Sequence, residues 1–175
     1  MDFYTTVFEV IDMRSFSNLW YWIGLAVLWS TASHWVLGIP YDLVMRARRM
    51  GGEVEQDMIA MLAASCRRLI HIGEVLGVWV LGGTCAVLSA LVVLGFWYEV
   101  EFAQAVFLLL FPLSIVGAFS VRAARRLIRQ SEGTADVYRR LARHRTLTRM
   151  IGFASIFVTA MWGMYQNLAV GPLGG

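Results

Sequence analysis

Three ionisable side chains, those of His34, His71 and Glu74, lie within or directly beside long apolar stretches of this sequence. An ionisable group at membrane depth is costly, and such groups mark ion pathways, proton relays and ligand sites. Glu74 with His34 would form a proton relay or an ion site, whereas His34 and His71 on neighbouring helices would suit the axial ligation of haem. Alternatively, Glu74 pairs with Arg67, Arg68 or one of the histidines and only holds helices together. The residue types leave these three interpretations open.

The remaining chemistry-bearing residues do not form an enzyme motif. Cys66 and Cys85 have no CxxC spacing and suggest neither a disulfide framework nor a metal site. The sequence also contains no phosphate-binding loop, nucleophile elbow, HExxH helix or Gly-rich dinucleotide turn. We therefore expect a protein that is not an enzyme and has no resident metal or cofactor, with haem or a bound lipid or pigment as the exceptions to test.

The elements that must position these residues are membrane helices. Of the 175 residues, 58% are hydrophobic and only 15% are charged, against about 25% charged in ordinary soluble domains. Four apolar runs without a formal charge cover 18–39, 75–98, 102–121 and 150–170. Each reaches the ~20 residues that a helix needs to cross ~30 Å of hydrocarbon. The sequence predicts one all-α transmembrane domain over 1–175, a four-helix bundle.

The arginines predict how this bundle is oriented. All 15 basic residues are Arg, and every one except Arg14 lies in the connections 40–74 and 122–149. Because cytoplasmic loops carry the excess of basic residues, we expect a multi-pass protein of the bacterial inner membrane with both termini in the periplasm. Arg clusters that flank apolar runs indicate membrane topology rather than nucleic-acid binding. The basic tips predicted to contact membrane lipids or a protein partner include Arg46, Arg48, Arg49, Arg67, Arg68, Arg125, Arg126, Arg139, Arg140 and Arg143.

Both basic connections are predicted to be helical. Pro40 breaks or kinks the first helix, and a second helix begins near Glu53 and continues to Trp97. The third helix is prolonged over 121–130, and a fourth runs from Thr134 to Leu168. The chain therefore predicts two antiparallel helical hairpins with cytoplasmic extensions, 40–74 and 122–149.

The N-terminal segment predicts an amphipathic helix over 2–14. Phe3, Tyr4, Val7, Phe8 and Ile11 fall on one helical face, and the polar residues lie elsewhere. Such a helix lies on a membrane surface or on a partner.

Small residues predict a helix-contact face along the second hydrophobic run. They allow two helices to approach closely, either inside the bundle or against a separate subunit. The residues are Gly73, Gly77, Gly82, Ala86 and Ala90.

Three stretches carry a resemblance to a known family: MDFYTTVF at 1–8, SNLWYW at 17–22 and FVTAMWGMYQN at 157–167. They are similar to a family of small four-span inner-membrane proteins of photosynthetic and related alphaproteobacteria, some of which are labelled "component of SufBCD complex". The resemblance extends over most of the chain. It implies a bacterial inner-membrane protein that works beside something larger, and it carries no functional residues over to this sequence.

Together these patterns favour a non-catalytic accessory or scaffold subunit of a larger inner-membrane complex, of the energy-transducing kind, with other membrane-protein subunits as partners. A small oligomeric ion or proton transporter that uses Glu74 and His34 is the alternative. A haem protein with His34 and His71 as ligands is the third hypothesis.

Overall fold

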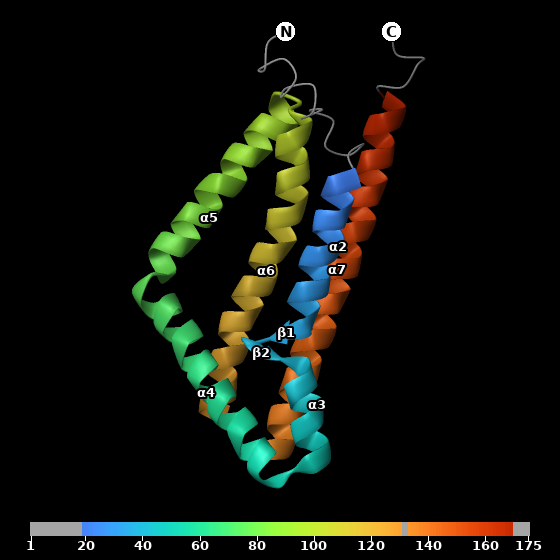
Figure 1. Cartoon of the computed structure of the whole chain (residues 1–175). Helices are drawn as coiled ribbons and strands as arrows, with labels where there is room; N and C mark the ends of the chain where they lie inside the picture. The colour runs from blue at the N-terminus through green and yellow to red at the C-terminus, as the bar shows by residue number, and fades with distance from the viewer. Residues whose placement is uncertain (1–18, 131–132, 170–175) are drawn as a thin grey trace, which may run out of the picture.

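The computed structural model describes residues 19–130 and 133–169, and these residues are almost entirely helical. The predicted interfacial helix at 2–14 lies outside the described residues. The all-α class is confirmed, with one short β-hairpin as its exception (Figure 1). The elements in chain order are α2 (Leu19–His34), β1 (Trp35–Val36), β2 (Ile39–Pro40), α3 (Tyr41–Met50), α4 (Gly52–Val75), α5 (Gly77–Val92), the π-helical turn η2 (Val93–Trp97), α6 (Glu101–Gln130) and α7 (Thr134–Ala169).

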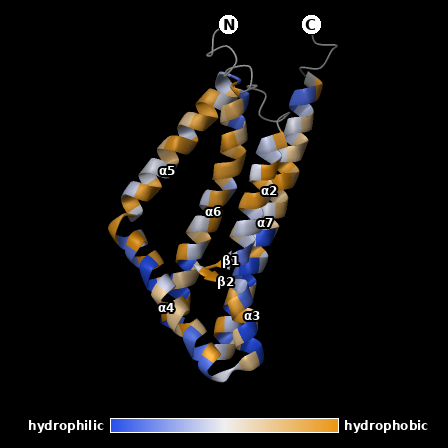
Figure 2. Cartoon of the chain, viewed as in Figure 1, coloured by the Kyte–Doolittle hydropathy of each residue, from blue (hydrophilic) through white to orange (hydrophobic). Residues whose placement is uncertain are grey.

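Three helices of the described residues are long and apolar enough to cross a membrane. They are Gly77–Trp97, which joins α5 to η2, then α6, and then α7 as far as Leu168. Figure 2 shows apolar residues along the upper parts of these helices and hydrophilic residues gathered towards the lower end. The predicted extensions of the third and fourth helices are confirmed, since α6 continues to Gln130 and α7 begins at Thr134.

The first predicted span, 18–39, is only partly helical. Its helix, α2, ends at His34 after 16 residues, which corresponds to about 24 Å. The chain then turns back on itself as a two-stranded hairpin in which Trp35 pairs with Pro40. Leu37 and Gly38 form the turn with φ values of 51° and 84°, a left-handed conformation that favours glycine and costs energy at leucine.

Burial explains why leucine occupies this strained position. Val36, Leu37 and Ile39 are at most 3% exposed, and a Cβ added at Gly38 would lie 3.2 Å from Ser65 Cβ on α4. The hairpin therefore seals one side of an apolar core at the arginine-rich end. Besides these three residues, that core contains Val44, Ala47, Met58, Leu62, Cys66, Ala124, Leu127, Val137 and Leu141.

A second, smaller core joins α2, α6 and α7. Leu25 and Trp29 of α2 pack with Val116 of α6 and with partly buried residues of α7. The Trp29 ring lies so close to α7 that a Cβ added at Gly152 would be 2.8 Å from Trp29 Cε3. Because Gly152 has no side chain, it leaves the space beside α7 that the Trp29 indole occupies.

The predicted continuous helix over 53–97 is wrong, because the helix breaks at Leu76 (φ −107°, ψ 1°), between α4 and α5. Gly73 and Gly77 flank this bend, and glycine is a weak helix former. Below the bend, α4 packs on α6. Above it, α5 begins apart from α6 and approaches it towards η2 (Figure 1).

Pro112 interrupts the hydrogen-bond ladder of α6 and, in doing so, links α6 to α7. A proline has no N–H and leaves the carbonyl four residues earlier without its helical partner, which here is that of Leu108. Ser155 of α7 donates its hydroxyl to Leu108 O at 3.4 Å. A neighbouring helix thus satisfies the freed carbonyl, as apolar surroundings require.

We expect Gly152→Ala to destabilise the α2–α7 contact by about 1–3 kcal/mol, the usual range for overpacking. The added methyl group would overlap the Trp29 ring and force it to move. Thermal unfolding in detergent, monitored by tryptophan fluorescence, measures the effect.

Gly117→Ala on α6 is the matched control, since an added Cβ there meets no described atom within 4 Å. Equal melting temperatures for the two variants would contradict the assigned role of Gly152.

Candidate functional site

The three ionisable residues predicted to act together are placed on different parts of the molecule. His34 Nε2 lies 3.8 Å from Asp42 Oδ2 of α3, and both side chains are well exposed. His71 and Glu74 are exposed on α4. Among the described residues no hydrogen bond or ion pair joins the three. Moreover, α2 packs on α7, whereas α4 packs on α3 and α6, and in Figure 1 α6 lies between α2 and the end of α4.

The described residues also contain no group of three or more His, Cys, Asp or Glu side chains that could hold a metal ion. Cys66 is fully buried in the apolar core, and burial raises the pKa of its thiol to about 11. Because the thiolate is the reactive and metal-binding form, Cys66 acts as a core residue. Cys85 is exposed on α5.

The predicted small-residue face is divided by the bend at Leu76. Gly73 lies at the α4–α6 contact, where an added Cβ would be 3.2 Å from Val121 Cγ1. At Gly77 and Gly82 an added Cβ would meet no described atom within 4 Å. The first part of the face thus packs inside the molecule, and the part on α5 does not.

A polar network that the sequence analysis missed lies where η2, α6 and α7 meet. Gln104 of α6 is 3% exposed, and its Nε2 donates to Gly95 O at 2.7 Å. Its Oε1 accepts from Trp162 Nε1 at 2.9 Å and from Gln166 Nε2 at 2.6 Å. Because the indole N–H can only donate, the amide orientation of Gln104 is fixed.

The π-helical turn creates the acceptor for this network. Tyr98 N bonds to Val93 O and Val100 N bonds to Leu94 O, so the carbonyl of Gly95 is left for Gln104. The approach is close, since a Cβ added at Gly95 would lie 3.0 Å from Gln104 N. The signal in the sequence was a glutamine inside an otherwise apolar run.

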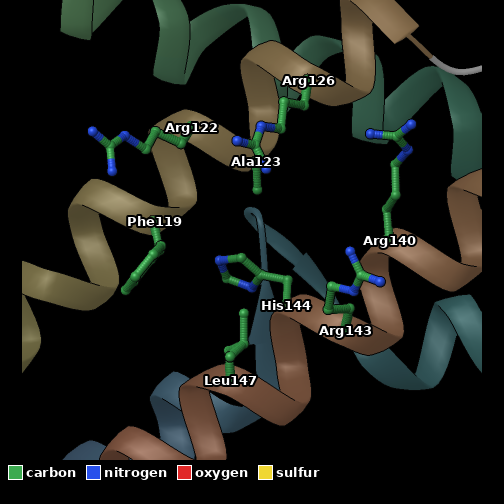
Figure 3. A pocket seen from close by; sticks show the side chains of 8 residues that line it. All are labelled: Phe119, Arg122, Ala123, Arg126, Arg140, Arg143, His144 and Leu147. Carbon is green, nitrogen blue, oxygen red and sulfur yellow. The ribbon is translucent and has the colours of Figure 1, made fainter.

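A basic pocket between α6 and α7 brings together three of the predicted basic-tip residues, Arg126, Arg140 and Arg143 (Figure 3). Arg122 and His144 also line it, and the sequence did not single them out. The pocket has a volume of about 190 Å³ and combines arginines with apolar residues. We call it the Arg pocket. Its lining residues are Phe119, Arg122, Ala123, Arg126, Arg140, Arg143, His144 and Leu147.

His144, buried to 7% exposure, forms one wall of the Arg pocket. Its Nε2 lies 3.1 Å from Ser120 Oγ, and Ser120 donates its hydroxyl to Val116 O at 2.8 Å. A hydroxyl has one hydrogen, so Nε2–H of His144 is the donor to Ser120. The lone pair then resides on Nδ1, which is buried and has no partner among the described residues.

This hydrogen-bond direction bears on chemistry as well. In a catalytic Ser–His pair the hydroxyl donates to the imidazole, and a further group orients the second ring nitrogen. Here the hydroxyl of Ser120 donates to its own helix, and Nδ1 of His144 meets no carboxylate among the described residues. The pair is arranged to position the imidazole rather than to activate the serine.

Of the arginines around the pocket, Arg140 is ion-paired. Its Nε lies 2.6 Å from Asp136 Oδ2, and its Nη2 donates to Gln130 O at 3.2 Å. Arg122, Arg126 and Arg143 have no hydrogen-bond or ion-pair partner among residues 19–130 and 133–169. The pocket therefore presents three exposed guanidinium groups that have no partner among the described residues.

No protein-family model, no curated protein and no solved structure matches this chain.

We expect Gln104→Leu to destabilise the protein by about 1–3 kcal/mol, because the apolar side chain leaves Gly95 O and Trp162 Nε1 buried without partners. Thermal unfolding in detergent and the fluorescence maximum of Trp162 in an otherwise Trp→Phe background report the change.

Ser114→Ala serves as the control, since Ser114 Oγ bonds only within its own helix, to Phe111 O. A melting temperature for Gln104→Leu as high as that of Ser114→Ala would show that the network does not hold the three elements together.

Proposed function

We propose that this protein is a non-catalytic accessory or scaffold subunit of a larger complex in the bacterial inner membrane. It crosses the membrane four times, through α2, through α5 with η2, through α6 and through α7. The arginine-rich end lies in the cytoplasm and both termini lie in the periplasm. The observation that carries the proposal is the position of α5, which lies apart from α6 near Leu76 and has no buried residue.

The four-span topology is supported by α2 and its surroundings. Although α2 is short, it carries no Asp, Glu, Lys or Arg, and it packs beside α7 through Trp29. The apolar hairpin residues that follow it, including Val36 and Ile39, extend the uncharged stretch. The hydrophilic, arginine-rich ends of α3, α4, α6 and α7 lie opposite the start of α2 and the end of α7 (Figure 2), as the positive-inside rule requires for this orientation.

The packing of α5 differs from that of the other membrane helices. No residue of α5 is buried, and Val78 and Trp79 are at least 80% exposed. Its space beside α6 forms an apolar groove of about 440 Å³, which we call the α5 groove. The groove is lined by Trp79, Gly83, Thr84 and Val87 of α5 and by Leu110 and Ser114 of α6, among others.

A transmembrane helix of another subunit is the occupant that best fits the α5 groove. In lipid, helices associate through van der Waals packing, so a helix gains little by standing apart from its neighbours. Small residues permit the close approach of a second helix, and Gly83 and Thr84 of α5 line the groove. At Gly83 an added Cβ meets no described atom within 4 Å, which leaves room for a partner's backbone.

The test is purification of the tagged full chain from its native membranes in a mild detergent, followed by native electrophoresis and mass spectrometry. We expect a discrete assembly that contains other membrane proteins. The identity of the co-purified subunits then shows whether the assembly is respiratory or photosynthetic.

Gly83→Leu, which fills the α5 groove, is expected to release those subunits. Gly24→Leu on α2 is the control, because Gly24 also has no described atom within 4 Å of an added Cβ and lies outside the groove. A chain that purifies alone or only with copies of itself, or an assembly that Gly83→Leu leaves intact, would overturn the proposal.

A further inference from the structure

The Arg pocket has an amphiphilic arrangement that neither the fold nor the proposed scaffold role requires. Along α6 the lining passes from Phe119 to Arg122 and Arg126, and along the antiparallel α7 it passes from Leu147 to Arg143. Both helices therefore place an apolar side chain towards their membrane part and arginines towards the cytoplasmic tip. Figure 3 shows Phe119 and Leu147 at one end of the pocket and Arg126 towards the other.

The depth of the pocket is that of lipid headgroups. It lies where the charge-free run 102–121 gives way to arginines and shortly before the run 150–170 begins. Residues at this boundary meet both acyl chains and phosphates. A ligand matched to the pocket would bear a negative charge on one side and a hydrocarbon chain on the other.

The charges favour a phosphate in particular. Arg122, Arg126 and Arg143 line the same pocket and have no partner among the described residues. Guanidinium groups present several donors in a planar fork that suits phosphate oxygens. A bound phosphate would offset these positive charges and accept from their donors.

We propose that the Arg pocket binds the phosphate of an anionic glycerophospholipid. Arg122, Arg126 and Arg143 contact the phosphodiester, and the first part of an acyl chain lies along Phe119 and Leu147. The lipid form is favoured over a free phosphate ester because of this apolar pair and the depth of the pocket.

Native mass spectrometry of the full chain in a neutral detergent, titrated with lipids, tests the proposal. We expect phosphatidylglycerol and phosphatidylmethanol, which are anionic, to bind, and phosphatidylcholine, which is zwitterionic, not to bind. Equal binding of phosphatidylglycerol and phosphatidylcholine would overturn the proposal.

The triple variant Arg122→Gln, Arg126→Gln and Arg143→Gln is expected to lower phosphatidylglycerol affinity about a hundredfold. The matched control is Arg49→Gln, Arg68→Gln and Arg129→Gln, which removes the same charge from exposed positions outside the pocket. Circular dichroism and size-exclusion chromatography confirm that both variants fold. Equal losses in the two triple variants would show unspecific attraction between charges and overturn the site.

Competition with soluble glycerol phosphate and inorganic phosphate separates the two sources of the anion. We expect neither to displace phosphatidylglycerol at millimolar concentration. Displacement by either would reassign the pocket to a free phosphate ester and overturn the lipid assignment. Loss of lipid binding would not affect the co-purified subunits on which the scaffold proposal depends, so the two proposals fail independently.

Discussion

In apolar surroundings, every backbone carbonyl that leaves the helical ladder must find another donor, and the rest of this structure depends on how two such carbonyls are satisfied. Pro112 frees the carbonyl of Leu108, and Ser155 of α7 donates to it. The π-helical turn frees the carbonyl of Gly95, and Gln104 donates to it. Both bonds have one partner in α6. This helix therefore becomes the one against which its neighbours are positioned.

The bond between Gly95 and Gln104 also explains why α5 remains attached to α6 although part of it lies away from that helix. Its upper end is tied to α6 by the bond between Gly95 and Gln104. Its lower end continues, after the bend at Leu76, into α4, which packs on α6 through the close contact of Gly73 with Val121. Because both ends are held in this way and the chain bends at Leu76, the part of α5 between them cannot lie along α6. The groove is thus a consequence of the anchors, and a partner helix would complete the packing that they prevent.

The sequence could predict the features that depend on residue type along the chain. Charge-free runs and arginine clusters located α6 and α7 and their extensions. The hairpin at 35–40 could not be predicted, because the strained turn at Leu37 is stable only when buried beneath α4. The network around Gln104 joins residues 58 and 62 positions apart, and the environment of His144 depends on a contact with Ser120 on another helix. Such pairings become visible only after the helices are packed.

The length of α6 connects this packing to the orientation in the membrane. Its 30 residues correspond to about 45 Å, whereas the hydrocarbon layer is ~30 Å thick. The helix is therefore about 15 Å longer than the hydrocarbon layer. At its arginine-rich end, Leu127 and Leu141 enter a core of their own and Arg145 stacks on the Tyr41 ring at 3.7 Å. This core holds α6 and α7 together where their arginines line one pocket, which is the arrangement that the proposed lipid site requires.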